Sequence, residues 1–285
     1  MKTPFLTFAL LLSIAAVFAQ GVKPGTTPVK KWETGPGLKI PESVMYDATT
    51  GVIYVSNIDG NPGEKDGKGS IGTIAPDGKI LNPEWVKGID APKGMGILNK
   101  HLFVTNIDEL VEIDIATATI VNRYKAEGSQ FLNDIAADPN SGRIFITDSG
   151  TGQVYILLNG KISLWLKGPT YKGANGLFLK DNILYIGAGN SILQTDLKND
   201  KVTVSVPNTG GVDGLFVTSD GKFIFSDWAG SLFMAELNKK PELLLNTSDQ
   251  KVNAADFGII AEKHLILIPT FFDNRVMCYT SSVIH

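Results

Sequence analysis

Four polar residues that could bind a metal ion stand at the starts of apolar segments spread along this chain. They are two carboxylates and two carboxamides: Glu42, Asn133, Asn175 and Asp213. All four offer oxygen atoms, and an all-oxygen set favours a hard cation such as Ca²⁺, which takes about six to eight oxygen ligands. Because the set contains no histidine or cysteine, Zn²⁺ is less favoured, and Mg²⁺ and Mn²⁺ are further alternatives. If the fold gathers these side chains, the sequence predicts one bound divalent cation.

The elements that must position these residues repeat six times. Each repeat of roughly forty residues opens with a small or polar residue that leads into an apolar strand; a turn and a second apolar strand follow. Repeats of this length with several short strands are typical of a β-propeller. The sequence therefore predicts an all-β fold, a six-bladed β-propeller with mostly four-stranded blades. The openings lie at Glu42, Lys93, Asn133, Asn175, Asp213 and Asp256.

The last repeat ends early, and this predicts how the ring closes. It stops soon after its third strand, at Tyr279, whereas the segment from Val29 to Trp32 precedes the first repeat. An N-terminal strand that completed the last blade would remove an open sheet edge. We expect residues 35–285 to form the propeller and residues 21–34 to supply a leader and the closing strand.

One face of such a disc, here called the mouth, should hold the starts of the innermost strands and the ends of the second strands. Five aromatic residues could either line an apolar rim there or pack between blades: Trp228, Phe271, Phe272, Phe131 and Tyr171. The long glycine-rich stretch over residues 59–72 of the first repeat is either a lid or a solvated loop. The candidate substrate-binding residues are Asn57, Asn106, Asp134, Asp148, Asp227, Asp256, Trp228 and Phe271.

The first twenty residues differ from the rest of the chain. They carry one charge, at Lys2, followed by an apolar run and a small-residue cleavage pattern near Ala19, which indicates a secretory signal peptide. We therefore expect a secreted or periplasmic protein. A net charge of −3 without a basic stripe argues against nucleic acid as a partner. No later segment is apolar for long enough to span a membrane. A small-molecule substrate is the expected partner, and the oligomeric state is not indicated.

The order of the polar residues resembles that of the senescence-marker-protein/gluconolactonase family, which includes the regucalcin-like lactonases. That family carries Glu at the first innermost strand, Asn-Asp at the third, Asn-Gly at the fourth and Asp-Gly at the fifth. Here these places, within roughly residues 36–279, hold Glu42, Asn133-Asp134, Asn175-Gly176 and Asp213-Gly214.

The resemblance implies a central metal bound by Glu42, Asn175 and Asp213, with Asn133 as a further ligand or a substrate contact. It also implies hydrolysis of a lactone or related ester. In that reaction the metal polarises the carbonyl group. Asp213 would be the catalytic residue, either as general base or as nucleophile.

Two other functions remain open. A non-catalytic secreted propeller could bind a small ligand, a glycan or a protein partner at the mouth, and any metal would then be structural. A lyase on a related propeller is the third alternative, although such enzymes usually use other axial residues. The complete set of four polar residues favours the hydrolase, because a pure binding module need not keep it and because buried carboxylates are costly without a partner.

Overall fold

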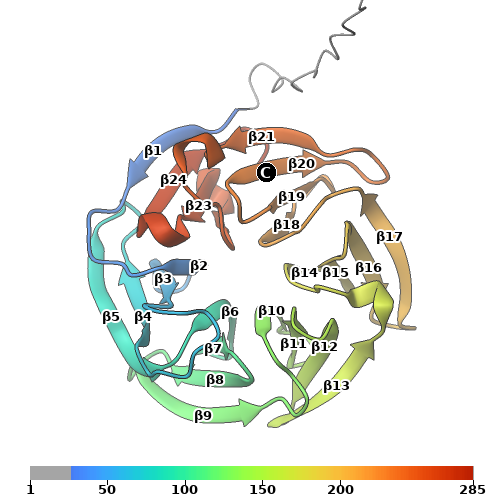
Figure 1. Ribbon diagram of the computed structural model, residues 1–285, viewed down its shortest axis with the longest axis horizontal. Helices are drawn as coiled ribbons and strands as arrows, with labels where there is room; N and C mark the ends of the chain where they lie inside the picture. The colour runs from blue at the N-terminus through green and yellow to red at the C-terminus, as the bar shows by residue number, and fades with distance from the viewer. Residues whose placement is uncertain (1–26, 285) are drawn as a thin grey trace, which may run out of the picture.

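The structure is a ring of six four-stranded antiparallel sheets arranged around a central axis (Figure 1). It is a computed structural model, and it describes residues 27–284. This arrangement confirms the predicted all-β, six-bladed β-propeller. The predicted signal peptide over residues 1–20 and most of the leader lie outside the described residues. Within the described part of the chain, no helix is long and apolar enough to cross a membrane.

Each blade is numbered from its innermost strand outward in chain order, except that the last blade takes its outermost strand from the N-terminus. Blade 1 consists of β2 (Pro41–Asp47), β3 (Val52–Asn57), β4 (Gly69–Ile74) and β5 (Ile80–Ile89), and blade 2 of β6 (Pro92–Leu98), β7 (His101–Asn106), β8 (Glu109–Asp114) and β9 (Thr119–Lys125). Blade 3 consists of β10 (Leu132–Asp138), β11 (Arg143–Asp148), β12 (Gln153–Leu158) and β13 (Lys161–Lys167), and blade 4 of β14 (Leu177–Lys180), β15 (Ile183–Ala188), β16 (Ser191–Asp196) and β17 (Lys201–Pro207).

Blade 5 consists of β18 (Leu215–Val217), β19 (Phe223–Ser226), β20 (Ser231–Ala235) and β21 (Glu242–Asn246), and blade 6 of β22 (Gly258–Ile260), β23 (Leu265–Pro269), β24 (Val276–Thr280) and β1 (Val29–Glu33). Four single-turn 3₁₀ helices lie in the connections: η1 (Pro169–Tyr171), η2 (Ser248–Gln250), η3 (Ala261–Lys263) and η4 (Phe271–Asp273).

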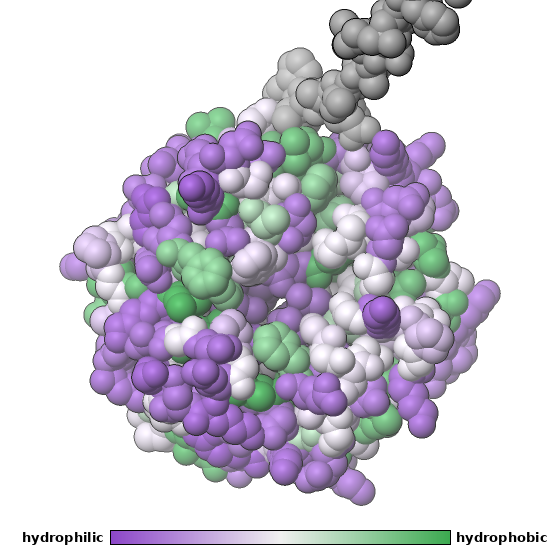
Figure 2. All heavy atoms as spheres, viewed as in Figure 1, coloured by the Kyte–Doolittle hydropathy of each residue, from purple (hydrophilic) through white to green (hydrophobic). Residues whose placement is uncertain are grey.

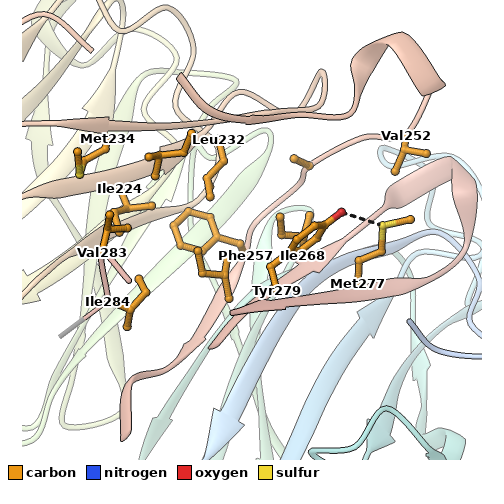
Figure 3. Packing of buried hydrophobic residues seen from close by; sticks show 13 residues of the cluster. Ile224, Leu232, Met234, Val252, Phe257, Ile268, Met277, Tyr279, Val283 and Ile284 are labelled. Carbon is orange, nitrogen blue, oxygen red and sulfur yellow. Dashed lines mark hydrogen bonds between the residues drawn. The ribbon is translucent and has the colours of Figure 1, made fainter. Parts of the chain in front are cut away.

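The middle strands of the blades are buried because neighbouring sheets pack against both of their faces. β3, with the sequence VIYVSN, is buried at every residue after its first. β-branched and aromatic side chains fit such a two-sided surface. The outermost strand β9 instead leaves most of its residues exposed. Figure 3 shows one layer of the core between two blades, where Ile224 and Leu232 of blade 5 lie near Phe257 and Ile268 of blade 6.

The N-terminal strand closes the ring, as the sequence predicted. β1 pairs antiparallel with β24, with Val29 opposite Thr280 and Trp32 opposite Cys278. Figure 1 shows β1 along the outer edge of blade 6, beside β24. The Trp32 side chain packs against the cluster that contains buried Cys278. Both ends of the described chain are therefore held in one sheet, and the ring has no open blade.

The long connection over residues 58–68, between β3 and β4, lies at the mouth. Lys65 Nζ forms an ion pair with Asp108 Oδ1 at 2.6 Å, and the Gly67 N–H donates to Asp90 Oδ1 at 3.0 Å. These contacts attach the connection to blade 2. We call residues 58–68 the mouth loop. The end of the glycine-rich stretch seen in the sequence belongs to the buried strand β4 and not to this loop.

Candidate functional site

The residues that open the innermost strands are held in place by hydroxyl groups of the second strands. The register shifts between Pro41 and Ser43, so the Ser43 N–H leaves the regular ladder and donates to Ser56 Oγ at 2.9 Å. The Asp134 N–H donates in the same way to Thr147 Oγ1 at 2.9 Å. Because a bulge would otherwise leave a buried N–H without a partner, the hydroxyl stabilises it. Glu42 and Asn133, which directly precede these two N–H groups, lie within the bulges and are thereby fixed at the axis.

Glycine follows the axial residue in three blades because the neighbouring blade approaches too closely for a side chain. A Cβ atom on Gly176 would lie 2.4 Å from the backbone oxygen of Asp213, and one on Gly214 would lie 2.7 Å from the backbone nitrogen of Phe257. Real Cβ atoms do not approach backbone atoms so closely. The Asn-Gly and Asp-Gly pairs in the sequence are therefore required for the starts of adjacent innermost strands to converge.

Three of the predicted metal ligands each present one buried oxygen without a hydrogen-bond partner. These atoms are Glu42 Oε2, Asn175 Oδ1 and Asp213 Oδ2, from blades 1, 4 and 5. Asn175 and Asp213 are in direct contact, because Asn175 Nδ2 donates to Asp213 Oδ1 at 2.7 Å. Buried polar groups in folded proteins are nearly always paired, so three orphaned oxygens at one axis require an explanation. Their chemistry suits a hard cation.

This donor set combines carboxylate and carboxamide oxygens. Among residues 27–284, no group of three or more His, Cys, Asp or Glu side chains could hold a metal by itself. The candidate set therefore depends on the carboxamide of Asn175 as well as on two carboxylates. Asn133, the fourth predicted ligand, is buried, and its Nδ2 donates to Ser149 Oγ at 3.1 Å. That bond leaves the carbonyl oxygen of Asn133 for another partner.

The axial carboxyls resist ionisation because they are buried together. Burial raises the pKa of Glu42 well above its usual value; the negative charge of Asp213 adds to the rise, and the positive charge of Lys93 opposes it. Burial raises the pKa of Asp213 to about 7, against the hydrogen bond from Asn175, which lowers it. Burial, together with neighbouring carboxylates, also raises the pKa of Asp256 well above its usual value. A bound cation would offset this repulsion.

A cavity of about 360 Å³ runs among the innermost strands. Its polar end includes Ser43, Asp134 and Asp256, and Ser43 Oγ donates to Asp256 Oδ2 at 2.6 Å. Side chains such as Met95 and Phe216 make the remainder apolar. Figure 2 shows a narrow hollow at the centre of the visible face, with many hydrophilic residues around it.

Asp134 and Asp256, two candidate substrate-binding residues, line this cavity, and Glu42, Asn175 and Asp213 are not among its lining residues. The Asp134 carboxylate also accepts the backbone N–H groups of Leu177 and Ile135, at 2.5 and 2.6 Å. Burial raises its pKa to about 7, and these two hydrogen bonds oppose the rise.

The polar residues at the ends of the second strands brace the backbone of the mouth. Asn106 Oδ1 accepts the N–H groups of residues 90 and 91, and Asp148 accepts those of the two residues ahead of β10. Asn57 Oδ1 accepts one N–H from the segment ahead of β2, and Asp227 Oδ1 accepts two from its own turn. Oxygen atoms of these four side chains are thus used in hydrogen bonds within the fold. That these residues also contact a substrate stays a prediction.

An exposed aromatic cluster stands on the rim of the mouth. The rings of Trp228, Phe271 and Phe272 meet edge to face, with centroids 5.4 Å apart for Trp228 and Phe271 and 4.8 Å apart for Phe271 and Phe272. Trp228 is 41% exposed and Phe272 61%, whereas Phe271 is buried. Trp228 and Phe271 both adopt positive φ angles, which bulky residues rarely do. Phe271 packs in a buried cluster with Ala255, which directly precedes Asp256, so the aromatic cluster borders the start of the last innermost strand.

Lys93 is a site residue that the sequence reasoning missed. It opens the second repeat at the place that Glu42 and Asn133 occupy in theirs, but a lysine does not belong to a set of oxygen donors. Its side chain is buried, and Nζ donates to the backbone oxygens of Pro62 at 3.0 Å and Ala91 at 3.1 Å. Burial lowers its pKa to about 8, and the charge of Glu42 opposes the fall. Its repeat position was the signal that could have identified it.

No family model matches the chain, and no curated protein matches it in sequence. Among solved structures, a streptogramin B lyase superimposes with a TM-score of 0.61. The match covers 90% of this chain and 97% of that chain, at 10% sequence identity. At such low identity the likeness extends to the six-bladed propeller fold alone.

Proposed function

We propose that this protein is a metal-dependent hydrolase that opens a lactone or a related carboxylic ester at the mouth of the propeller. The observation that carries the proposal is the set of three buried, unpartnered oxygens on Glu42, Asn175 and Asp213. Two carboxylates and a carboxamide carbonyl, contributed by three blades, would form the donor set. A fold that needed these positions only for packing would not bury charged groups without partners.

The proposed metal is Ca²⁺, with Mg²⁺, Mn²⁺ and Zn²⁺ as alternatives, because every donor is an oxygen. Glu42, Asn175 and Asp213 would hold it, and Asn133 would be a further ligand or a substrate contact. When bound, the ion acts as a Lewis acid toward an ester carbonyl.

Asp213 is the residue we assign as general base or nucleophile. Asn175 holds its Oδ1, so the unpartnered Oδ2 is the atom available to the site. As a base, that oxygen would take the proton of the attacking water. As a nucleophile, it would attack the carbonyl carbon as the ester C–O bond breaks, and water would then hydrolyse the resulting mixed anhydride.

The first experiment is the metal content of the purified protein, measured by elemental mass spectrometry. We expect about one equivalent of calcium in the wild type and its loss in the double variant Glu42→Gln/Asp213→Asn. Glu236→Gln, which changes an exposed carboxylate of blade 5, is the matched control and should keep the metal. A wild type that stays metal-free after addition of calcium would refute the proposal and favour a non-catalytic binding propeller.

A lyase is the second candidate, and the likeness to the streptogramin B lyase structure favours it. The two reactions differ in their use of water. A hydrolase adds the oxygen atom of water to the product, and a lyase does not. Turnover in isotopically labelled water, followed by mass spectrometry of the product, separates them. Label in the new carboxylate supports the hydrolase, and an unlabelled elimination product supports the lyase.

A further inference from the structure

We infer that Lys93 is a second electrophilic group of this site, which binds the ester oxygen on which negative charge develops and then the carboxylate of the product. The inference rests on the proposed function for its reaction. Binding of the product carboxylate, however, can be measured without turnover.

The place of Lys93 in the ring brings it to the axial residues. It lies in β6 of blade 2, at the position that Glu42 holds in blade 1 and Asn133 in blade 3. The next residue, Gly94, approaches blade 3 so closely that a Cβ atom on it would lie 2.6 Å from the backbone oxygen of Asn133. Glu42 holds the equivalent position on the other neighbouring blade. In the order of the ring, Lys93 therefore follows a proposed metal ligand and precedes a proposed ligand or substrate contact.

The Lys93 ammonium is buried without a contacting carboxylate. The residue is 1% exposed, and within residues 27–284 no carboxylate oxygen lies within 4.0 Å of Nζ. A buried charge is costly unless it is paired, and an apolar side chain would fill the same space at lower cost. A charge retained in this way requires a partner, and an anionic ligand in the site would be one.

The ammonium is also oriented. It has three N–H donors. Two are taken by the backbone oxygens of Pro62 and Ala91, and the face of the Phe131 ring lies 4.2 Å from Nζ. The third donor has no acceptor atom among the described residues. A fixed ammonium with one free N–H in a desolvated site is the arrangement that stabilises a developing oxyanion.

The step can be written in full. The water oxygen attacks the carbonyl carbon and gives up a proton to the general base, while the π electron pair moves onto the carbonyl oxygen. That oxygen then accepts a hydrogen bond from Lys93. The pair returns to re-form the carbonyl as the ester C–O bond breaks, and the leaving oxygen takes the proton from the base. Lys93 keeps its own proton throughout. The new carboxylic acid then loses its proton to solvent, and the resulting carboxylate lies where the oxyanion was.

Lys93 also holds the mouth loop through Pro62, so a test must separate the two effects. Lys93→Met removes the charge and keeps the apolar stem, whereas Lys93→Arg keeps the charge. Lys65→Met breaks the ion pair between the same loop and Asp108, and it reports on the loop alone.

The experiment uses the full chain loaded with calcium, with γ-butyrolactone as substrate and 4-hydroxybutyrate as the carboxylate probe. In Lys93→Met we expect binding of 4-hydroxybutyrate by calorimetry to weaken about tenfold or more, and kcat to fall about 10²- to 10³-fold with little change in KM. The calcium content should not change. Lys93→Arg should recover part of the binding, and Lys65→Met should have a far smaller effect.

The inference is overturned if Lys93→Met binds 4-hydroxybutyrate as tightly as the wild type does. It is also overturned if the wild type does not bind 4-hydroxybutyrate at all. Loss of calcium from Lys93→Met also overturns it, because Lys93 would then be structural. If that variant does not fold, Lys93→Gln, which keeps two donors for the carbonyls without the charge, replaces it under the same criteria. Product binding that depends on Lys93 in a protein that hydrolyses neither lactones nor esters would refute the proposed hydrolase and leave only the carboxylate-binding part of the inference standing.

Discussion

The side-chain amide of Asn175 donates a hydrogen bond to Oδ1 of Asp213 at 2.7 Å, across the boundary between blades 4 and 5. This contact orients both side chains. It leaves Asn175 Oδ1 and Asp213 Oδ2 as the two oxygens without a hydrogen-bond partner. Because Nδ2 of Asn175 faces Asp213, the carboxamide oxygen Oδ1 points away from that hydrogen bond. Two neighbouring blades thus present a matched pair of oxygen donors.

We expect Asn175→Ala to weaken calcium binding about 10- to 100-fold, because it removes one proposed ligand and the hydrogen bond that orients another. Calorimetric titration with calcium measures the effect. Asn140→Ala, in an exposed turn of blade 3, is the control and should bind like the wild type. Equal affinities in all three proteins would contradict the assignment of Asn175.

Asp213→Asn should abolish hydrolysis, with kcat lowered about 10²- to 10⁴-fold, because a carboxamide can neither accept the proton of water nor attack a carbonyl. The assay follows acid release from a panel of lactones and esters at constant pH. The Glu236→Gln control should hydrolyse at the wild-type rate. Full activity in Asp213→Asn would remove Asp213 from the catalytic role.

Gly176→Ala should destabilise the fold by about 1 to 3 kcal/mol, because the added Cβ would lie 2.4 Å from the backbone oxygen of Asp213 and would push the two blades apart. Urea unfolding measures the free energy of unfolding. Gly211→Ala, whose Cβ would meet nothing within 4 Å, is the matched control. A Gly176→Ala variant as stable as this control would show that the close approach is not required.

Cys278 reports on the closing strand. Burial raises the pKa of its thiol from 9.0 to about 12, so at pH 8 it should not react with a disulfide reagent in the folded protein. Because the protonated form favours the folded state, this contribution to stability is complete below pH 9 and is lost as the pH rises toward 12.

Trp32→Ala removes a side chain of β1 that packs against the cluster containing Cys278, and it should speed the reaction of the thiol. The rate of thiol release in native buffer measures this, and the denatured protein should react at once as the control. Rapid reaction of the folded wild type would be incompatible with a closed sixth blade.

Local patterns in the sequence are sufficient for much of this fold. Alternating apolar strands, Asp-Gly and Asn-Gly turns and a repeat of roughly forty residues each reflect short-range geometry, and together they predict six blades. The closing strand was predictable because the last repeat is incomplete and a propeller with an open edge is unfavourable. The candidate ligands Glu42, Asn175 and Asp213 were predictable because equivalent positions in repeats face one axis.

What the sequence by itself determined, therefore, is the ring and the residues that open its innermost strands. Only the tertiary structure decided how those side chains are used. Asp134 and Asp256 line the inner cavity, and Asp148 is occupied by backbone N–H groups. Lys93 is a candidate site residue because packing buries its ammonium against the mouth loop. Hydrogen bonds and burial of this kind join segments that are distant along the chain, and no local pattern records them.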